Sequence, residues 1–138
     1  MSQENVEIVR SAVERFVATG EMSPETAAED IAWHDPPDFP DAQVHVGVEG
    51  VIRALGVWAD AWSEWQIGFD EYVDAGDHVL VRGWQRGRGK DTDALVEQPL
   101  LLLYLLRDGK VIEVRAFFDA GQALEAAGLS EQDAHADS

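Results

Sequence analysis

Leu100-Leu101-Leu102-Leu103-Tyr104-Leu105-Leu106 is apolar without a break, and the chain then turns at Asp108-Gly109. Both residues of that pair tolerate the positive φ that a tight hairpin turn requires. In the returning arm the apolar residues alternate with Glu113 and Arg115, and these apolar residues are Ile112, Val114, Ala116 and Phe118. A continuous apolar arm beside an alternating one is typical of a central strand buried on both faces. The hairpin over residues 95–118 therefore predicts the middle of a sheet, with helices on one face and a second copy of the sheet on the other.

The residues before this hairpin predict mainly helices. Apolar residues three and four apart indicate a helix from Ser2 to Gly20 and a second one over Glu49–Trp65. Ser23-Pro24-Glu25 has the pattern of a helix start, and we expect a short helix that ends near Glu29. Ile31 to His34 predicts a short edge strand, because the prolines that follow Asp35 cannot donate to a ladder. The segment from there to Gly47 is expected to be a loop.

The remaining sequence predicts strands and one closing helix. Strands over Ile67–Val73 and His78–Arg86 flank a four-residue turn. Asp119 has the position of an N-cap for a final helix that Gly128 ends. We expect residues 1–129 to form a single domain and residues 130–138, which are small and polar, to form a disordered tail.

Composition narrows the classes of partner. The chain has 138 residues, 10 of them basic and 27 acidic, for a net charge of −17. Such a balance repels phosphate backbones and anionic lipids, so we expect no nucleic acid and no membrane as partner. Without cysteine there is no disulfide or thiolate site, and the four histidines lack the spacing of metal ligands, so no metal or cofactor is expected. The first residues lack the features of a signal peptide, which predicts a cytoplasmic protein.

The expected order of elements belongs to the α+β class, in which a curved antiparallel sheet wraps N-terminal helices into a cone. Six segments carry a family resemblance, and they are Ile31 to Pro37, Gly47 to Val51, Asp74 to Asp77, Arg86 to Gly89, Leu106 to Lys110 and Ala123 to Leu129. With these segments the chain resembles the SnoaL-like, or polyketide cyclase-like, members of the nuclear transport factor 2-like superfamily, which has a cystatin-like fold. The resemblance implies a small-molecule pocket. It leaves the activity open, because this fold hosts cyclases, isomerases, hydrolases and non-catalytic binding proteins.

A more distant similarity to the ketosteroid isomerases can be followed residue by residue. Those enzymes place a general base in an Asp-Pro step after the first strand, and Asp35-Pro36 occupies that step. They hold the enolate oxygen with a tyrosine on the first helix and a protonated aspartic acid on the central strand. The matching positions here are Phe16 and Leu102, which cannot donate a hydrogen bond. The resemblance therefore implies the base without its two partner donors.

Asp35 is the first candidate for a catalytic residue, and as a solvated turn residue or cap it would be purely structural. His34 is the alternative, because neighbouring residues of a regular strand point to opposite sides and only one of the two would line the pocket. Tyr104 is a candidate donor. The aromatic residues expected as pocket walls are Trp33, Trp58, Trp62, Trp84 and Phe118, beside Phe16 and Leu102. Arg82 and Arg86 would either clamp an anionic group or form a charged rim stacked on Trp84.

Three functions fit these residues. The first is an enzyme that performs general acid–base chemistry, of the isomerase, cyclase or hydrolase type, on an apolar cyclic substrate. The second is a non-catalytic binding protein for a small apolar ligand. The third is a dimerisation module whose tryptophans fill the cone. Because Leu101, Leu103 and Leu105 alternate away from the helix-covered face, we also expect a homodimer through the outer face of the sheet.

Overall fold

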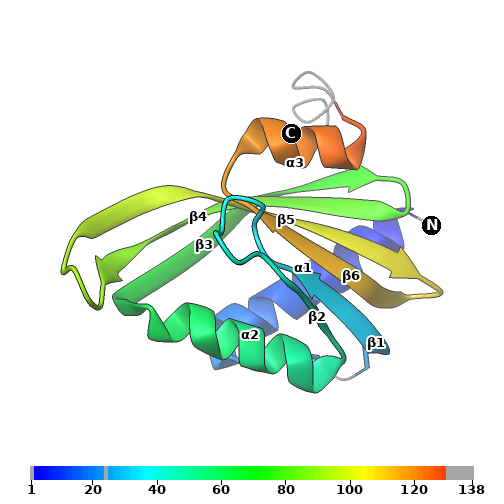
Figure 1. The fold of residues 1–138 in the computed structure, drawn as a ribbon. Coiled ribbons are helices and arrows are strands. Elements are labelled where there is room, and N and C mark those ends of the chain that lie inside the picture. Colours follow the sequence, from blue (N-terminus) through cyan, green and yellow to red (C-terminus); the bar gives the residue numbers. More distant parts are fainter. Residues whose placement is uncertain (1, 24, 130–138) are drawn as a thin grey trace.

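The computed structural model describes residues 2–23 and 25–129, which form three helices and one six-stranded sheet. Pro24 and the expected tail over 130–138 lie outside the described residues. The elements in chain order are α1 (Ser2–Thr19), β1 (Ala27–His34), β2 (Val44–Val46), α2 (Val48–Asp60), β3 (Trp62–Ala75), β4 (His78–Gly89), β5 (Leu95–Arg107), β6 (Lys110–Phe117) and α3 (Ala120–Ala127). The sheet order is β2-β1-β6-β5-β4-β3, and only β1 and β6 pair in parallel. The expected α+β class with a curved sheet is confirmed (Figure 1).

The hydrophobic run of β5 is buried on both faces of the sheet, as expected. Leu100, Leu102 and Leu106 join the core that α1 and α2 cover. Leu101 and Leu103 face the other way, into a second cluster with Leu124 of α3. Figure 1 shows α3 on the opposite face of the sheet from α1 and α2. The outer leucines are therefore only 2% and 1% exposed in the single chain, and a second copy is not needed to cover them.

The β5–β6 hairpin turns at the expected residues but differs in register. Asp108 and Gly109 have φ values of 53° and 78°, which suits a two-residue hairpin turn. The register shifts between Leu105, which pairs with Glu113, and Leu106, which pairs with Val111, so Ile112 is an extra residue on β6. The expectation that Ile112 shares a face with Val114 is wrong, because this bulge brings Val111 into the core instead.

The short helix expected between Ser23 and Glu29 is absent from the described part of that segment. Residues 25–26 form a turn, and β1 begins at Ala27. A helix of one or two turns is marginal by itself, whereas the strand gains a sheet partner, since Val111 donates a backbone hydrogen bond to Thr26 at 2.7 Å. β1 is also not an edge strand. It lies between β6 and β2, and β2 was expected to be loop.

The second long helix is shorter than expected, because α2 ends at Asp60 and Trp62 begins β3. Trp62 pairs with Gly89 of β4, and the strand continues through Trp65 and Ile67. Aromatic and β-branched residues favour a pleated, half-buried surface, which explains why this segment leaves the helix. The change matters for the site, since it puts the tryptophans of β3 on the sheet and Trp58 on the helix that faces them.

Candidate functional site

Asp35 is held in place by the chain on both sides of it. It follows the last residue of β1, and its amide donates to the carbonyl of Gln43 at 3.0 Å. The amide of Gln43 donates in return to Asp35 Oδ2 at 3.2 Å. Pro36 is buried directly behind it. The carboxylate therefore has little freedom to move, as an acid–base group requires.

His45 of β2 forms a pair with this carboxylate. Its Nε2 lies 3.1 Å from Asp35 Oδ2, and an ionised carboxylate only accepts hydrogen bonds, so Nε2 carries the proton and donates. The side chains are 26% exposed for His45 and 13% exposed for Asp35. Both contacts of the carboxylate use Oδ2, and among the described residues no hydrogen bond uses Oδ1. That oxygen is the one available to a bound molecule.

Two cavities bear on the candidate residues, and Asp35 and His45 line the larger of these, which has a volume of about 580 Å³. A volume of this size is in the range of sites for drug-sized molecules. Its aromatic walls are Phe39, Trp58, Trp62 and Phe118. Its other polar side chains are Asp41, Gln43, Gln85 and Gln98. The cone is thus hollow beside Asp35, and the expected wall residues Trp58, Trp62 and Phe118 face this space.

Gln85 of β4 ties the helix to the sheet next to this cavity. Its Oε1 accepts hydrogen bonds from the indole Nε1 atoms of Trp58, at 2.9 Å, and of Trp65, at 3.1 Å. The side chain is fully buried, and its Nε2 has no hydrogen-bond partner among the described residues. The sequence alone carries no signal that marks Gln85.

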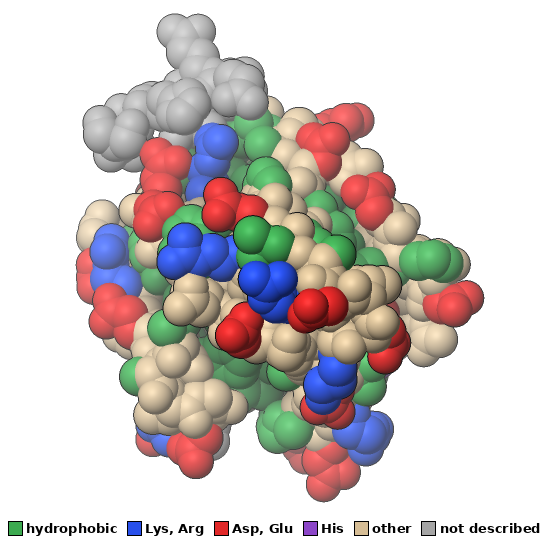
Figure 2. Space-filling view, turned by 90° about the vertical axis from the view of Figure 1, so that its left-hand side faces the viewer, with side chains coloured by type: hydrophobic (Ala, Val, Ile, Leu, Met, Phe, Trp, Pro, Cys, Tyr) green, Lys and Arg blue, Asp and Glu red, His purple; other side chains and the backbone are tan. Residues whose placement is uncertain are grey.

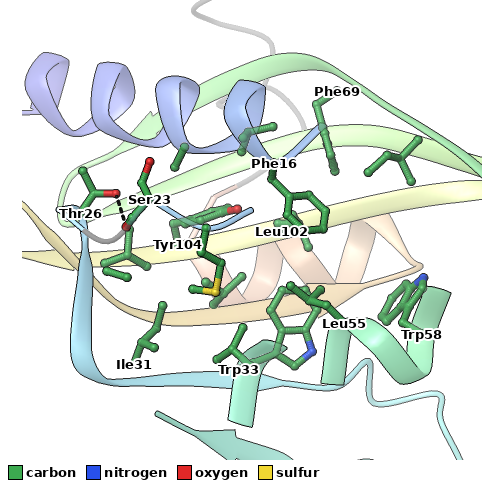
Figure 3. A pocket seen from close by; sticks show the side chains of 18 of the residues that line it. Phe16, Ser23, Thr26, Ile31, Trp33, Leu55, Trp58, Phe69, Leu102 and Tyr104 are labelled. Atoms are coloured by element: carbon green, nitrogen blue, oxygen red, sulfur yellow. Dashed lines mark hydrogen bonds between the residues drawn. The ribbon is translucent and has the colours of Figure 1, made fainter. Parts of the chain in front are cut away.

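The smaller cavity, of about 90 Å³, lies deeper in the cone and is almost entirely apolar. Phe16, Trp33, Leu102 and Tyr104 line it, and Figure 3 shows these side chains gathered between α1 and the strands. Burial raises the pKa of the Tyr104 phenol above its usual value, and nearby Tyr72 raises it further. The hydroxyl of Tyr104 therefore keeps its proton at neutral pH, and its role as a donor stays a prediction.

Trp58 lines both cavities and separates them. Its ring packs edge-on against Trp33, with centroids 6.2 Å apart, and against Phe118 at 5.6 Å. Phe39 lies 5.5 Å from the same ring. The candidate residues expected in one pocket are thus divided, with Asp35 on one side of this aromatic wall and Tyr104 on the other.

Four of the candidate residues lie in neither cavity. His34 lies opposite Asp35 and pairs with Glu113 at 2.6 Å. Arg82 pairs with Glu71 at 3.6 Å, and Arg86 donates to Gln66 at 2.7 Å while it stacks over Trp84. Trp84 lies flat on Gly68, where a side chain would come within 2.5 Å of its ring. Of the two roles expected for Arg82 and Arg86, an anion clamp or a charged rim, the structure agrees with the charged rim. Trp84 is not a pocket wall.

His45 is not among the residues predicted from the sequence, because the segment up to Gly47 is expected there to be loop. The alternation Val44-His45-Val46 was the available signal, since β2 pairs His45 with Trp33 on β1. Within the described residues, no group of three or more His, Asp or Glu side chains is placed to hold a metal ion. In the same part of the chain, no helix combines the length and the apolar character needed to cross a membrane.

Comparisons with known proteins agree with this architecture. The profile of the SnoaL-like domain matches residues 9–114. The solved structure of an NTF2-like protein from Burkholderia xenovorans LB400 is 30% identical over 92% of this chain and 97% of that chain, with a TM-score of 0.69. Among curated proteins, none matches this sequence significantly.

Two other solved structures share the fold at lower identity. A protein named as a SnoaL-like polyketide cyclase from Jannaschia sp. CCS1 is 22% identical over 94% of each chain, with a TM-score of 0.68. TerC, co-crystallised with polyporic acid, is 17% identical over 91% of this chain and 98% of that chain, also with a TM-score of 0.68. At these identities the likeness extends to the fold alone.

Proposed function

This chain belongs to the SnoaL-like family, and from that premise we propose that it is an enzyme that performs general acid–base chemistry, of the isomerase, cyclase or hydrolase type, on an apolar cyclic substrate. The observation that carries the proposal is the Asp35–His45 pair on the wall of the larger cavity. The family includes proteins named as polyketide cyclases, and TerC of the same fold was crystallised with polyporic acid, which supports a small-molecule ligand.

The proposed reaction begins with proton removal by Asp35. Its free oxygen, Oδ1, takes a proton from a carbon next to a carbonyl group, and the electron pair of the broken C–H bond moves to the carbonyl oxygen. Asp35 is then a neutral acid that returns the proton to another atom of the substrate. His45 donates to Oδ2 throughout, so it orients the carboxylate.

Non-catalytic binding is the second candidate, and one observation favours it. Phe16 and Leu102, which stand where the isomerases have their donors, line the smaller cavity and make it apolar. A site of that kind binds a ring system without stabilising an enolate. If the protein only binds its ligand, the ligand is released without chemical change.

Solvent deuterium exchange separates the two functions without knowledge of the natural substrate. The protein is incubated in heavy water with β-tetralone or cyclohexanone, and deuterium at the carbon next to the carbonyl is followed by NMR. We expect the wild type to speed the exchange. Asp35→Asn should abolish the gain, since the amide keeps the shape of the side chain and loses its basicity.

Asp38→Asn is the matched control, because Asp38 lies in the same loop, is exposed and lines neither cavity. This variant should exchange the ketone as fast as the wild type. Asp35→Asn should retain its stability within about 1 kcal/mol. Exchange that survives in Asp35→Asn contradicts the proposed function and leaves the binding function.

A further inference from the structure

The orientation of the Gln85 amide is fixed by its two tryptophan neighbours. Indole Nε1 is a donor only, so the atom that accepts from both Trp58 and Trp65 must be the amide oxygen. Trp58 comes from α2 and Trp65 from β3, so the amide is held from two directions. The amide nitrogen must then point away from both indoles.

The Nε2 group of Gln85 is a buried donor without a hydrogen-bond partner in the described part of the chain. Gln85 is 0% exposed and lines the larger cavity, and no described residue accepts a hydrogen bond from its Nε2. Leaving a buried donor unpaired costs about 1–3 kcal/mol, and most buried polar groups in proteins are paired. The amide nitrogen is closed off from solvent in this structure, so an acceptor on a molecule bound in the cavity satisfies this donor once it displaces the side chains that cover the amide.

The charges around the cavity restrict the kind of acceptor. Asp35 and Asp41 line the same space, and the chain as a whole carries a net charge of −17. A carboxylate or phosphate would be repelled by these carboxylates, whereas a neutral carbonyl oxygen would not. The aromatic walls provided by Trp58 and Trp62 suit the ring that carries such a carbonyl.

We propose that Gln85 binds the carbonyl oxygen of a neutral cyclic ketone, ester or lactone through Nε2–H, and that Trp58 and Trp65 are positioning residues that fix the amide. This inference rests on the proposed function, because it names the substrate class of that same site. In the proton transfer, Asp35 takes the proton and Gln85 donates to the oxygen on which negative charge develops. Gln85 thereby supplies a donor that Phe16 and Leu102 lack.

Binding of matched ligands to Gln85→Met tests the assignment. The ligands are β-tetralone with its hydrocarbon tetralin, and cyclohexanone with cyclohexane, and the fluorescence of the cavity tryptophans reports occupancy. In the wild type we expect each ketone to bind about tenfold more tightly than its hydrocarbon. In Gln85→Met the ratio of ketone to hydrocarbon affinity should fall at least tenfold, because the buried carbonyl then has no donor to replace water, while the hydrocarbon keeps its affinity.

Gln66→Met is the matched control, since Gln66 lies on the outer face and lines neither cavity, so this variant should keep the wild-type ratio. Trp65→Phe removes one of the two donors to Oε1 and should lower the ketone ratio without abolishing it. If Gln85 has a purely structural role, Gln85→Met should weaken the binding of ketone and hydrocarbon equally. That result overturns the proposal, as does a wild type that binds neither ketone or shows no preference.

The two proposals fail separately. Asp35→Asn should lose deuterium exchange and keep the ketone preference, because the amide of Gln85 is untouched. If the protein shows no exchange but prefers ketones in a way that depends on Gln85, then the catalytic function is excluded and the carbonyl-binding site stands. If exchange depends on Asp35 but Gln85→Met keeps the wild-type ketone preference, then the proposed reaction stands and Gln85 has no part in it.

Discussion

His34 and His45 lie on neighbouring strands, yet only His45 belongs to the cavity. Strand alternation separates His34 from Asp35, and His34 pairs with Glu113 instead. His45 donates to the carboxylate that lines the cavity. The expectation that only one of His34 and Asp35 faces the cavity agrees with this arrangement, and Asp35 is that residue.

Substituting the two histidines in turn is the first prediction. His45→Phe removes the donor to Asp35 Oδ2 and should slow ketone exchange about tenfold or more, because the carboxylate loses its orientation. His34→Phe removes only the outer pair with Glu113 and should leave the rate unchanged. The measurement is deuterium exchange at fixed protein concentration. A slower rate in His34→Phe than in His45→Phe would reverse the assignment.

The two tyrosines provide a prediction at high pH. Burial raises the pKa of the phenols of Tyr104 and Tyr72, so both stay protonated in the folded protein when an unfolded tyrosine ionises near 10. Only the unfolded state then loses the proton, so the free energy of unfolding should fall as the pH rises above about 10. Tyr104→Phe should reduce that fall. Urea unfolding at neutral pH and at about pH 11 checks this.

Tyrosinate absorbance provides the control for this prediction. The chain has two tyrosines, so the native protein should show little tyrosinate absorbance at a pH where the urea-unfolded protein shows that of both. Full native absorbance near pH 10 would mean that the phenol of Tyr104 is solvated.

At the level of elements, α3 is part of the core, and Leu103 lies beneath it. Asp119 caps the helix by accepting from the amides of Gly121, at 2.7 Å, and Gln122, at 3.3 Å. Leu103→Asp would place an unpaired charge in this cluster and should lower the free energy of unfolding by at least about 3 kcal/mol. Arg107→Asp, at the exposed end of β5, should change it by less than about 1 kcal/mol.

Chemical denaturation of the two variants checks the prediction, with circular dichroism to follow the fold. If Leu103→Asp is as stable as the wild type and only its assembly state changes, then α3 does not cover Leu103 in solution.

The elements with a strong local signal could be predicted from the sequence. The run Leu100 to Leu106, the Asp108-Gly109 turn and the Asp119 cap each specify their structure within a few residues. β2 could not be predicted this way, because three residues gain their strand structure only from pairing with β1. Trp62 and Trp65 fitted a helical pattern that pairing with β4 overrides.

The candidate site could be predicted only in part for the same reason. Asp35 is identified by its Asp-Pro step, and Trp58 and Trp62 by their size. The partners that give these residues a role come from distant segments, as His45 does from β2 and Gln85 does from β4. A single sequence contains no distances, so neither contact could be derived from it.

For the whole molecule, the outer face of the sheet is divided between α3 and a polar surface. Figure 2 shows one end of the molecule, where acidic and basic side chains are interspersed and hydrophobic side chains show in a hollow of its lower half. The part of the outer face around Trp84 carries Arg82 and Arg86 and is not covered by the core of α3. The sequence predicts a homodimer through Leu101, Leu103 and Leu105. Because α3 covers the first two, we propose the part around Trp84 as the interface instead.

Sedimentation of the wild type at micromolar concentration should give a dimer. Trp84→Glu should shift it toward the monomer, because the change places a charge at the centre of the proposed interface. Arg107→Asp should leave the dimer intact, since Arg107 lies at the end of the hairpin. A monomeric wild type, or equal effects from the two substitutions, would exclude an interface at Trp84.

The larger cavity beside Asp35 is the proposed binding place of a small molecule, and a crystal structure of the protein with β-tetralone is the measurement that tests it. We predict the ketone between Trp58 and Trp62, with its carbonyl oxygen within hydrogen-bond distance of Gln85 Nε2 and the adjacent carbon facing Asp35 Oδ1. A ketone seated instead in the smaller cavity beside Tyr104, or on the outer face of the sheet, would contradict the account.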